Sequence, residues 1–246
     1  MILMPYTLTY KPFGEYAVLV EWPADIDIQF LNDIISFKDL IVKTGIKQIL
    51  ELRVSYNSLL IIYSKYLFSF NDEIAYIDKI YRDNKTLNKV DRLLWRIPVC
   101  YDEEFGLDLD FISKEKSFSK TEIVKRHSEA VYSVYFIGFL PGFLYLGGLD
   151  KLLHISRKST PRLYIEKGAV AIGGNQTGVY PNTSPGGWNI IGNSPINFFD
   201  ISKEKPCFAK AGDQIKFYPV SKKEHHDIKI LVDSNVYQLE SEVLNG

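Results

Sequence analysis

Cysteine is scarce in this chain, which has only Cys100 and Cys207 among its 246 residues. Two cysteines do not make a disulfide framework, and no C-x-x-C pair is present for zinc binding or redox chemistry. Long apolar runs are missing as well, since a membrane-spanning helix needs about 20 apolar residues and the runs here are strand-sized. The beginning of the chain lacks the basic and apolar stretches of a signal peptide. These absences predict a cytoplasmic protein with no membrane partner.

The chain also lacks an excess of charge of either sign. Lys and Arg together number 29, Asp and Glu number 30, and the formal net charge is −1. A dedicated nucleic-acid binder usually carries a strongly basic face, so this balance argues against a nucleic-acid partner. The hydrophobic share of 46% is that of an ordinary globular protein.

Several motifs of known chemistry are absent. The sequence contains no G-x-x-x-x-G-K-[ST] phosphate loop, no G-x-G-x-x-G fingerprint, no H-E-x-x-H helix and no G-x-S-x-G elbow. Four histidines are present, and two of them, His225 and His226, stand in a Lys/Glu-rich stretch that we expect to be a solvent-exposed turn. No metal ligand set is apparent, so we expect no bound metal.

Residues 1–90 are typical of a small α+β domain. The apolar spacing predicts a helix that Asp25 or Asp27 caps at its start and Gly45 at its end. Strands and a second helix surround it in the order strand, helix, strand, strand, helix, and a polar linker follows. The predicted ranges are strands 16–20, 48–54 and 58–63, helices 28–43 and 72–82, and the linker 83–89.

Residues 91–246 form the second predicted domain. A strand over 95–100 precedes two short helices, and Ser119 and Glu122 have the spacing of a capping box before the second helix. We expect these helices near 107–113 and 120–129. Beyond Ala130, short strands alternate with Gly/Pro turns to about residue 243, a pattern that favours a β-barrel or sandwich.

Glycine and positive charge are concentrated in one part of this second domain. Of 16 glycines, 11 lie between Gly138 and Gly192, where the chain either turns tightly or approaches something closely. Residues 131–199 hold five basic and two acidic side chains. Arg157, Lys158 and Arg162 are the candidate ligands for a small anionic substrate, since Pro161 stiffens their loop.

Neutral polar and aromatic residues follow the basic loop. Asn175, Gln176 and Thr177 stand between glycines, where amide and hydroxyl groups can recognise a small polar substrate. His127 precedes this segment and is a candidate acid/base group, although a structural role fits it as well. Other candidate wall and turn residues are Tyr180, Gly186, Gly187 and Trp188, of which Trp188 fits core packing equally well.

These same segments resemble a known family. His127, the run Val134–Gly148 (VYFIGFLPGFLYLGG), the run Gln176–Pro181 (QTGVYP) and the run Ser184–Gly192 (SPGGWNIIG) resemble blocks of the allophanate hydrolase subunit 1 / KipI family. Shorter matches are Ile97–Asp102 (IPVCYD) and Ala211–Asp213 (AGD). The matching blocks occur in order from about residue 95 to 220.

The resemblance implies an α+β chain with a small N-terminal domain and a cyclophilin-like β-barrel of the carboxyltransferase C/D type. It implies a subunit of an ATP-dependent 5-oxoprolinase, inactive alone, that opens 5-oxoproline to glutamate. A carboxyltransferase-like second subunit and a third subunit would be its partners, and ATP would be bound by the complex. In this interpretation His127 and Arg162 are catalytic, and the other candidates bind substrate. A KipI-type inhibitor of a sensor histidine kinase and a urea-pathway subunit remain alternatives.

Overall fold

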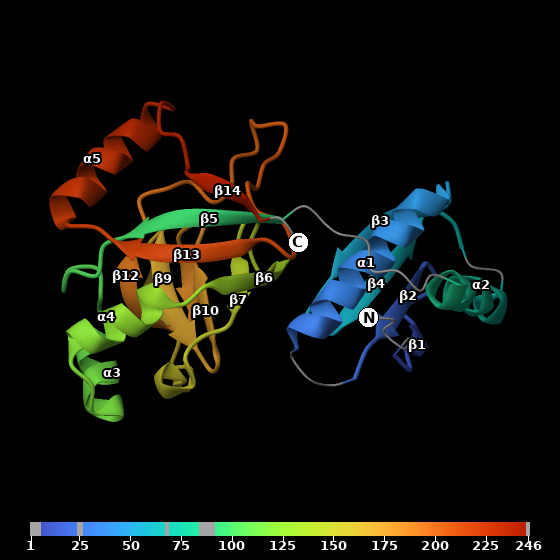
Figure 1. The fold of residues 1–246 in the computed structure, drawn as a ribbon, viewed down its shortest axis with the longest axis horizontal. Coiled ribbons are helices and arrows are strands. Elements are labelled where there is room, and N and C mark those ends of the chain that lie inside the picture. Colours follow the sequence, from blue (N-terminus) through green and yellow to red (C-terminus); the bar gives the residue numbers. More distant parts are fainter. Residues whose placement is uncertain (1–5, 24–26, 67–68, 84–91, 245–246) are drawn as a thin grey trace. The chain divides into compact units, whose positions relative to one another are not determined.

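The computed structural model describes residues 6–23, 27–66, 69–83 and 92–244. Contacts divide these residues into two compact units, one before residue 84 and one from residue 92 onward (Figure 1). Nearly all of the predicted linker 83–89 lies outside the described residues. No helix within the described ranges combines the length and apolarity that crossing a bilayer requires.

The first unit is an antiparallel sheet of four strands with a helix packed on it (Figure 1). The strand order β1-β2-β4-β3 makes β2 and β4 central, and their alternating buried residues, such as Val18 and Ile61, form the core with α1. The elements are β1 (Thr9–Pro12), β2 (Ala17–Glu21), α1 (Ile28–Thr44), β3 (Ile49–Val54), β4 (Ser58–Tyr63) and α2 (Phe70–Asp83).

Helix α1 begins and ends at the predicted caps. The Asp27 side chain accepts from the backbone N–H of Gln29 (2.8 Å), which satisfies one of the free N–H groups of the first turn. At the other end Gly45 has φ of 65°, the left-handed conformation that a glycine cap supplies without strain. Local chemistry therefore determines both ends of this helix.

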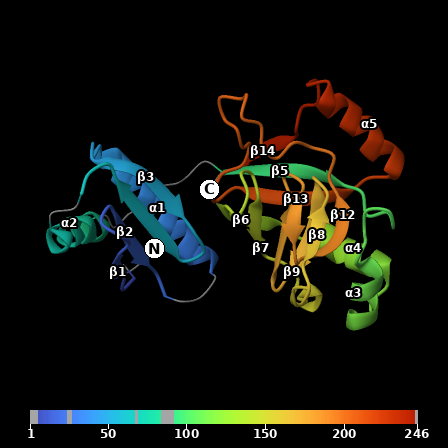
Figure 2. The same cartoon turned by 180° about the vertical axis from the view of Figure 1, so that it is seen from behind.

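The second unit is built on a mixed sheet of eight strands with helices beside it (Figure 2). Its order is β12-β9-β10-β7-β6-β13-β5-β14, and β13 runs parallel to β5 while the other pairs are antiparallel. The strands are β5 (Arg92–Val99), β6 (Tyr132–Ile137), β7 (Leu144–Gly147), β9 (Ala169–Gly173), β10 (Gln176–Val179), β12 (Asn189–Asn193), β13 (Gln214–Pro219) and β14 (Ser241–Leu244).

The remaining elements of this unit are helical or form a small ribbon of two strands. Strands β8 and β11 pair with each other and make a separate two-stranded sheet. The bounds are α3 (Leu109–Lys116), α4 (Lys120–Glu129), a 3-10 turn (Lys151–Leu153), β8 (Arg162–Ile165), β11 (Ser184–Gly186) and α5 (Lys222–Asp233). Helix α4 starts at Ser119, whose side chain accepts from the Glu122 N–H (3.1 Å) as the capping pattern predicts.

The expected closed β-barrel is not what the structure has. The sheet ends at β12 and β14, and these two strands do not pair with each other among the described residues. The sheet curls so that Cys100, just after β5, exchanges two backbone hydrogen bonds with Asn193 of β12 (2.8 and 2.9 Å). One isolated bridge does not complete a ladder, so the fold is a strongly curved, open mixed α/β arrangement.

The stretch after residue 220 is a helix, and the prediction of a solvated turn there was wrong for His225. Helix α5 has a full capping box, in which Ser221 and Glu224 satisfy each other's backbone N–H groups. His226 is exposed, but His225 is buried, with Nε2 2.9 Å from Asn193 Oδ1. Burial lowers the pKa of His225, since desolvation disfavours the charged ring.

Candidate functional site

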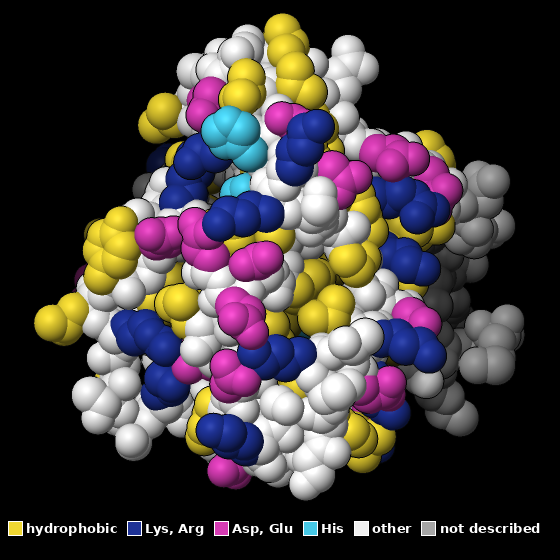
Figure 3. Space-filling model, turned by 90° about the vertical axis from the view of Figure 1, so that its left-hand side faces the viewer, with side chains coloured by type: hydrophobic (Ala, Val, Ile, Leu, Met, Phe, Trp, Pro, Cys, Tyr) yellow, Lys and Arg dark blue, Asp and Glu magenta, His cyan; other side chains and the backbone are white. Residues whose placement is uncertain are grey.

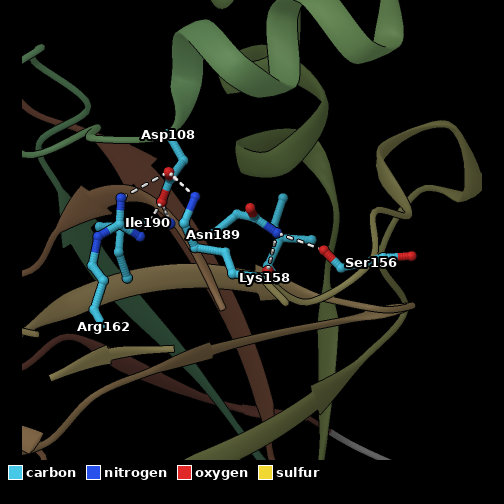
Figure 4. Close-up of polar contacts among 7 residues, drawn as sticks. Asp108, Ser156, Lys158, Arg162, Asn189 and Ile190 are labelled. Carbon is cyan, nitrogen blue, oxygen red and sulfur yellow. Dashed lines mark hydrogen bonds and ion pairs between the residues drawn. The ribbon is translucent and has the colours of Figure 1, made fainter. Parts of the chain in front are cut away.

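Asp108 is the centre of the basic cluster that the sequence predicts. It occupies the N-cap position of α3, yet its side chain makes no cap bond and turns toward β8 and β12 (Figure 4). Arg162, the first residue of β8, donates from Nη1 to Asp108 Oδ2 and from Nη2 to Oδ1, both at 2.8 Å. The pair is therefore bidentate, and only 4% of the Asp108 side chain is exposed.

Two further donors complete the shell around this carboxylate. Lys158 Nζ lies 2.8 Å from Oδ1, and the backbone N–H of Ile190 donates to Oδ2 (2.7 Å). Burial alone would raise the pKa of Asp108, but the hydrogen bonds from Arg162 and Lys158 outweigh it and lower the pKa below its usual range. Asp108 is thus a stable carboxylate that ties β8, β12 and the basic loop together.

The segment Gly187–Ile190 holds the basic loop in place. Gly187 accepts from the backbone N–H of Lys158 through its carbonyl oxygen (2.7 Å), and Asn189 Nδ2 donates to the carbonyl of Ser156 (3.0 Å; Figure 4). Asn189 is fully buried and also donates to Ile172 (3.3 Å). The backbone on both sides of Arg157 is consequently fixed by hydrogen bonds to one short segment.

Arg157 is presented differently from its two basic neighbours. Its side chain is exposed and lies over the Trp188 ring, with the guanidinium carbon 5.4 Å from the ring centroid. No ion pair or hydrogen bond ties it to another residue of the described ranges. Arg157 is therefore the candidate whose guanidinium hydrogen bonds remain available to an anion.

Trp188 belongs to a small core of its own on one side of the sheet. Phe143 meets it edge to face at 5.5 Å, and Gly173 lies so close beneath the indole that a Cβ there would be 2.6 Å from ring atoms. Tyr180 is buried in the same core, and burial raises the pKa of its phenol. Gly186 leaves room for that ring, because a Cβ would be 2.3 Å from the Tyr180 hydroxyl oxygen.

His127 and Thr177 lie in a different environment. Both are fully buried, and the ring is held between the Tyr101 hydroxyl at Nδ1 (2.8 Å) and Thr177 Oγ1 at Nε2 (2.9 Å). Thr177 in turn donates to the carbonyl of Ala171 (3.0 Å), so Nε2 carries the proton and Nδ1 accepts from Tyr101. Desolvation lowers the pKa of His127 to about 3. The ring is neutral and fully hydrogen-bonded.

The sheet separates His127 from the Arg157 side. Thr177 and Gly178 are neighbours on β10, so their side-chain directions point to opposite faces. Gly178 faces Trp188, since a Cβ there would be 3.1 Å from the indole. Gln176 shares the Trp188 face by the same alternation, and Asn175 is exposed just before it. The structure thus groups Arg157, Gln176 and Trp188, and places His127 and Thr177 behind them.

The charged surface of this unit is mixed. Seen from the side of α3 and α5, basic and acidic side chains alternate, and no broad patch of one sign covers this face (Figure 3). The same unit also contains ion pairs, such as that of Arg126 with Asp150 (2.7 Å). Within the part of the chain that the structure describes, no group of three or more His, Cys, Asp or Glu is placed to hold a metal ion.

Asp108 is the residue that the sequence analysis missed. It stands 50 residues before Lys158 and 54 before Arg162, so no local spacing connects it to them. Its only local feature is the position ahead of a helix, which predicts a cap and not an ion pair. The three cations are brought to one region, as expected, but two of them are already bound to a carboxylate.

Known proteins are similar to most of this chain. The family model for the carboxyltransferase domain, subdomain C and D, matches residues 8–209. The B subunit of 5-oxoprolinase from Haemophilus influenzae is 35% identical over 206 residues, which are 84% of this chain and 95% of that protein. The corresponding 5-oxoprolinase protein of Bacillus subtilis is 44% identical over 141 residues, which span 57% of this chain and 59% of the relative.

Longer proteins and solved structures show similarity too. The urea amidolyase of Saccharomyces cerevisiae is 26% identical across 96% of this chain, which matches only 14% of that protein. A conserved uncharacterized protein from Pyrococcus horikoshii is 36% identical, with a TM-score of 0.53 over 88% of this chain and all of that one. The Kluyveromyces lactis urea carboxylase structure covers 98% of this chain and 25% of its own, with a TM-score of 0.80 at 20% identity, which shows a shared fold.

Proposed function

The chain belongs to the carboxyltransferase domain, subdomain C and D, family, and on that premise we propose that it is a subunit of a 5-oxoprolinase. One observation carries the proposal: the similarity to the Haemophilus influenzae 5-oxoprolinase protein extends over 95% of that protein. The urea amidolyase similarity is weaker and covers a small part of a much longer chain, so it favours a common fold over a common reaction.

The proposed reaction is the ATP-dependent opening of 5-oxo-L-proline to L-glutamate. A lactam carbonyl reacts slowly with water, and transfer of the terminal phosphoryl group of ATP to its oxygen releases ADP and makes the carbonyl carbon more electrophilic. One water adds to that carbon, the ring nitrogen takes up a proton and leaves as the C–N bond breaks, and the product is the acyl phosphate of glutamate. A second water then cleaves the acyl phosphate into glutamate and phosphate. We assign ATP to the assembled complex, with a carboxyltransferase-like second subunit and a third subunit as partners.

Within this chain, Arg157 is the residue we assign to the substrate carboxylate. Its guanidinium is exposed, lies over Trp188 and is free of ion pairs among the described residues. A charge-assisted hydrogen bond of this kind contributes about 1.5–3 kcal/mol. We assign the lactam amide to Gln176, which is buried on the same face of β10, and to its exposed neighbour Asn175.

Lys158, Arg162 and His127 have supporting roles in this proposal. Asp108 accepts hydrogen bonds from both Lys158 and Arg162 and so fixes the backbone that carries Arg157. His127 is buried, neutral and bonded at both ring nitrogens, which suits a structural link between α4 and β10 better than a proton carrier.

Reconstitution tests the proposal. The chain is combined with its candidate partner subunits, and glutamate release is measured with 5-oxoproline, allophanate or urea, each with and without ATP. We expect glutamate only from the full complex with ATP, and none from the chain alone. Consumption of allophanate or urea without turnover of 5-oxoproline would refute it, as would inhibition of a sensor histidine kinase in place of any turnover.

A further inference from the structure

The ribbon formed by β8 and β11 carries exposed apolar side chains on both of its faces. Leu163 is 90% exposed and Tyr164 is 63% exposed. Adjacent residues of a strand point to opposite faces, so neither face of β8 is covered at these positions. Strand β8 pairs with β11 and with no other strand within the described ranges. The free edge of a strand presents backbone N–H and C=O groups to which a strand of another chain can pair.

A small apolar hollow adjoins this strand. Its volume is about 190 Å³, and Leu107, Tyr164, Ile165 and Ile190 are among its walls, with Glu104, Arg162 and Glu166 also lining it. Sites for small molecules and cofactors usually measure about 300–1,000 Å³. The hollow is therefore too small for a nucleotide and suits a single inserted side chain. Leu107 adds to the exposed apolar area, since it is 58% exposed.

The strand and the hollow are continuous with the candidate site. Arg162 is the first residue of β8, lines the hollow and donates hydrogen bonds from both Nη atoms to Asp108. Lys158 donates to the same carboxylate. These bonds anchor β8 to the loop that presents Arg157. A polypeptide bound along β8 would thus contact the strand whose first residue, Arg162, belongs to the cluster that fixes the loop of Arg157.

We propose that Leu107, Leu163, Tyr164 and the adjoining hollow form a docking surface, the β8 surface, for another subunit of the complex, which inserts an apolar side chain into the hollow. The inference rests on the proposed function for its occupant. Relatives of this length are named as one subunit of 5-oxoprolinase, and the urea carboxylase structure contains the same fold as 25% of a longer chain. In both cases further polypeptide accompanies this fold, and an exposed apolar edge with an anchor pocket is what such an interface requires.

The test compares a charge placed on the β8 surface with the same charge placed elsewhere. Leu163→Glu and Leu107→Glu are each made in the full chain, and Ile201→Glu is the matched control, since Ile201 is 84% exposed and lies outside the β8 surface. Binding of each chain to the purified partner subunits is measured by calorimetry, and melting temperatures confirm that the variants fold. We expect both β8-surface variants to bind at least tenfold more weakly and the control to bind as the wild type does.

Partner binding of Leu163→Glu and Leu107→Glu equal to that of the control would overturn the proposal. Loss of a homodimer in light scattering, with partner binding unchanged, would also overturn it and assign the surface to a second copy. The measurement needs no turnover. If the complex assembles through the β8 surface yet fails to open 5-oxoproline, the docking assignment stands and the proposed reaction falls.

Discussion

Replacing Asp108 by alanine removes the acceptor that four hydrogen bonds share. The Ile190 N–H is then left buried and unpaired, at a cost of about 1–3 kcal/mol. Lys158 and Arg162 are each 27% exposed and can turn toward water, so their loss adds only about 1 kcal/mol. We expect the second unit to lose about 2–4 kcal/mol of unfolding free energy.

Scanning calorimetry of the full chain measures this loss. For a unit of this size, each 1 kcal/mol shifts the melting temperature by about 2–4 °C, so Asp108→Ala should melt roughly 5–15 °C lower. Glu103→Ala is the control, because Glu103 pairs with Lys120 in the same unit but is 83% exposed. A shift for Asp108→Ala no larger than that of the control would refute the central place given to this carboxylate.

Three further predictions concern charge and packing. Folding lowers the pKa of Asp108, so the stability that its carboxylate contributes is complete above the pKa of an unfolded aspartate, about 4, and is lost as the pH falls below it. The difference in urea midpoint between the wild type and Asp108→Asn should therefore shrink below about pH 4. A difference that stays constant would contradict this expectation. The pKa of His127 falls to about 3, so its ring signals in NMR should stay constant from about pH 5 to 8, and a titration near 6.5 would show that the ring reaches solvent. Gly173→Ala should displace the Trp188 indole, costing about 1–3 kcal/mol and shifting the tryptophan emission, and an unchanged spectrum would contradict the close packing.

Local elements of the fold could be predicted because their signals are local. The caps of α1 and α4 consist of residues within three or four positions of the helix ends, and both lie where the sequence places them. Helix α5 has the same kind of signal in Ser221 and Glu224, but the Lys/Glu-rich composition of this stretch led to the prediction of a turn. The curvature of the sheet depends on pairings such as β13 with β5, which are distant in the chain and leave no local pattern.

The candidate site could be located from sequence but not resolved into roles. Glycine and basic residues indicated the segment in which Arg157, Lys158 and Arg162 lie, because the glycines that close packing requires, such as Gly173, and the clustering of charge are visible in the sequence. What the sequence could not show is which cation is already paired. Asp108 reaches Arg162 and Lys158 only through folding, and this contact distinguishes Arg157 from its neighbours.

The central claim is that Arg157, held on a loop fixed through Asp108, binds the carboxylate of the substrate. The most direct measurement is the KM for 5-oxoproline of a reconstituted complex that carries Arg157→Gln, with Lys151→Gln, an exposed basic residue of the same unit, as the control. Loss of a charge-assisted bond of about 1.5–3 kcal/mol predicts a KM raised roughly 10- to 100-fold with kcat little changed. A KM equal to that of the control complex would contradict the account.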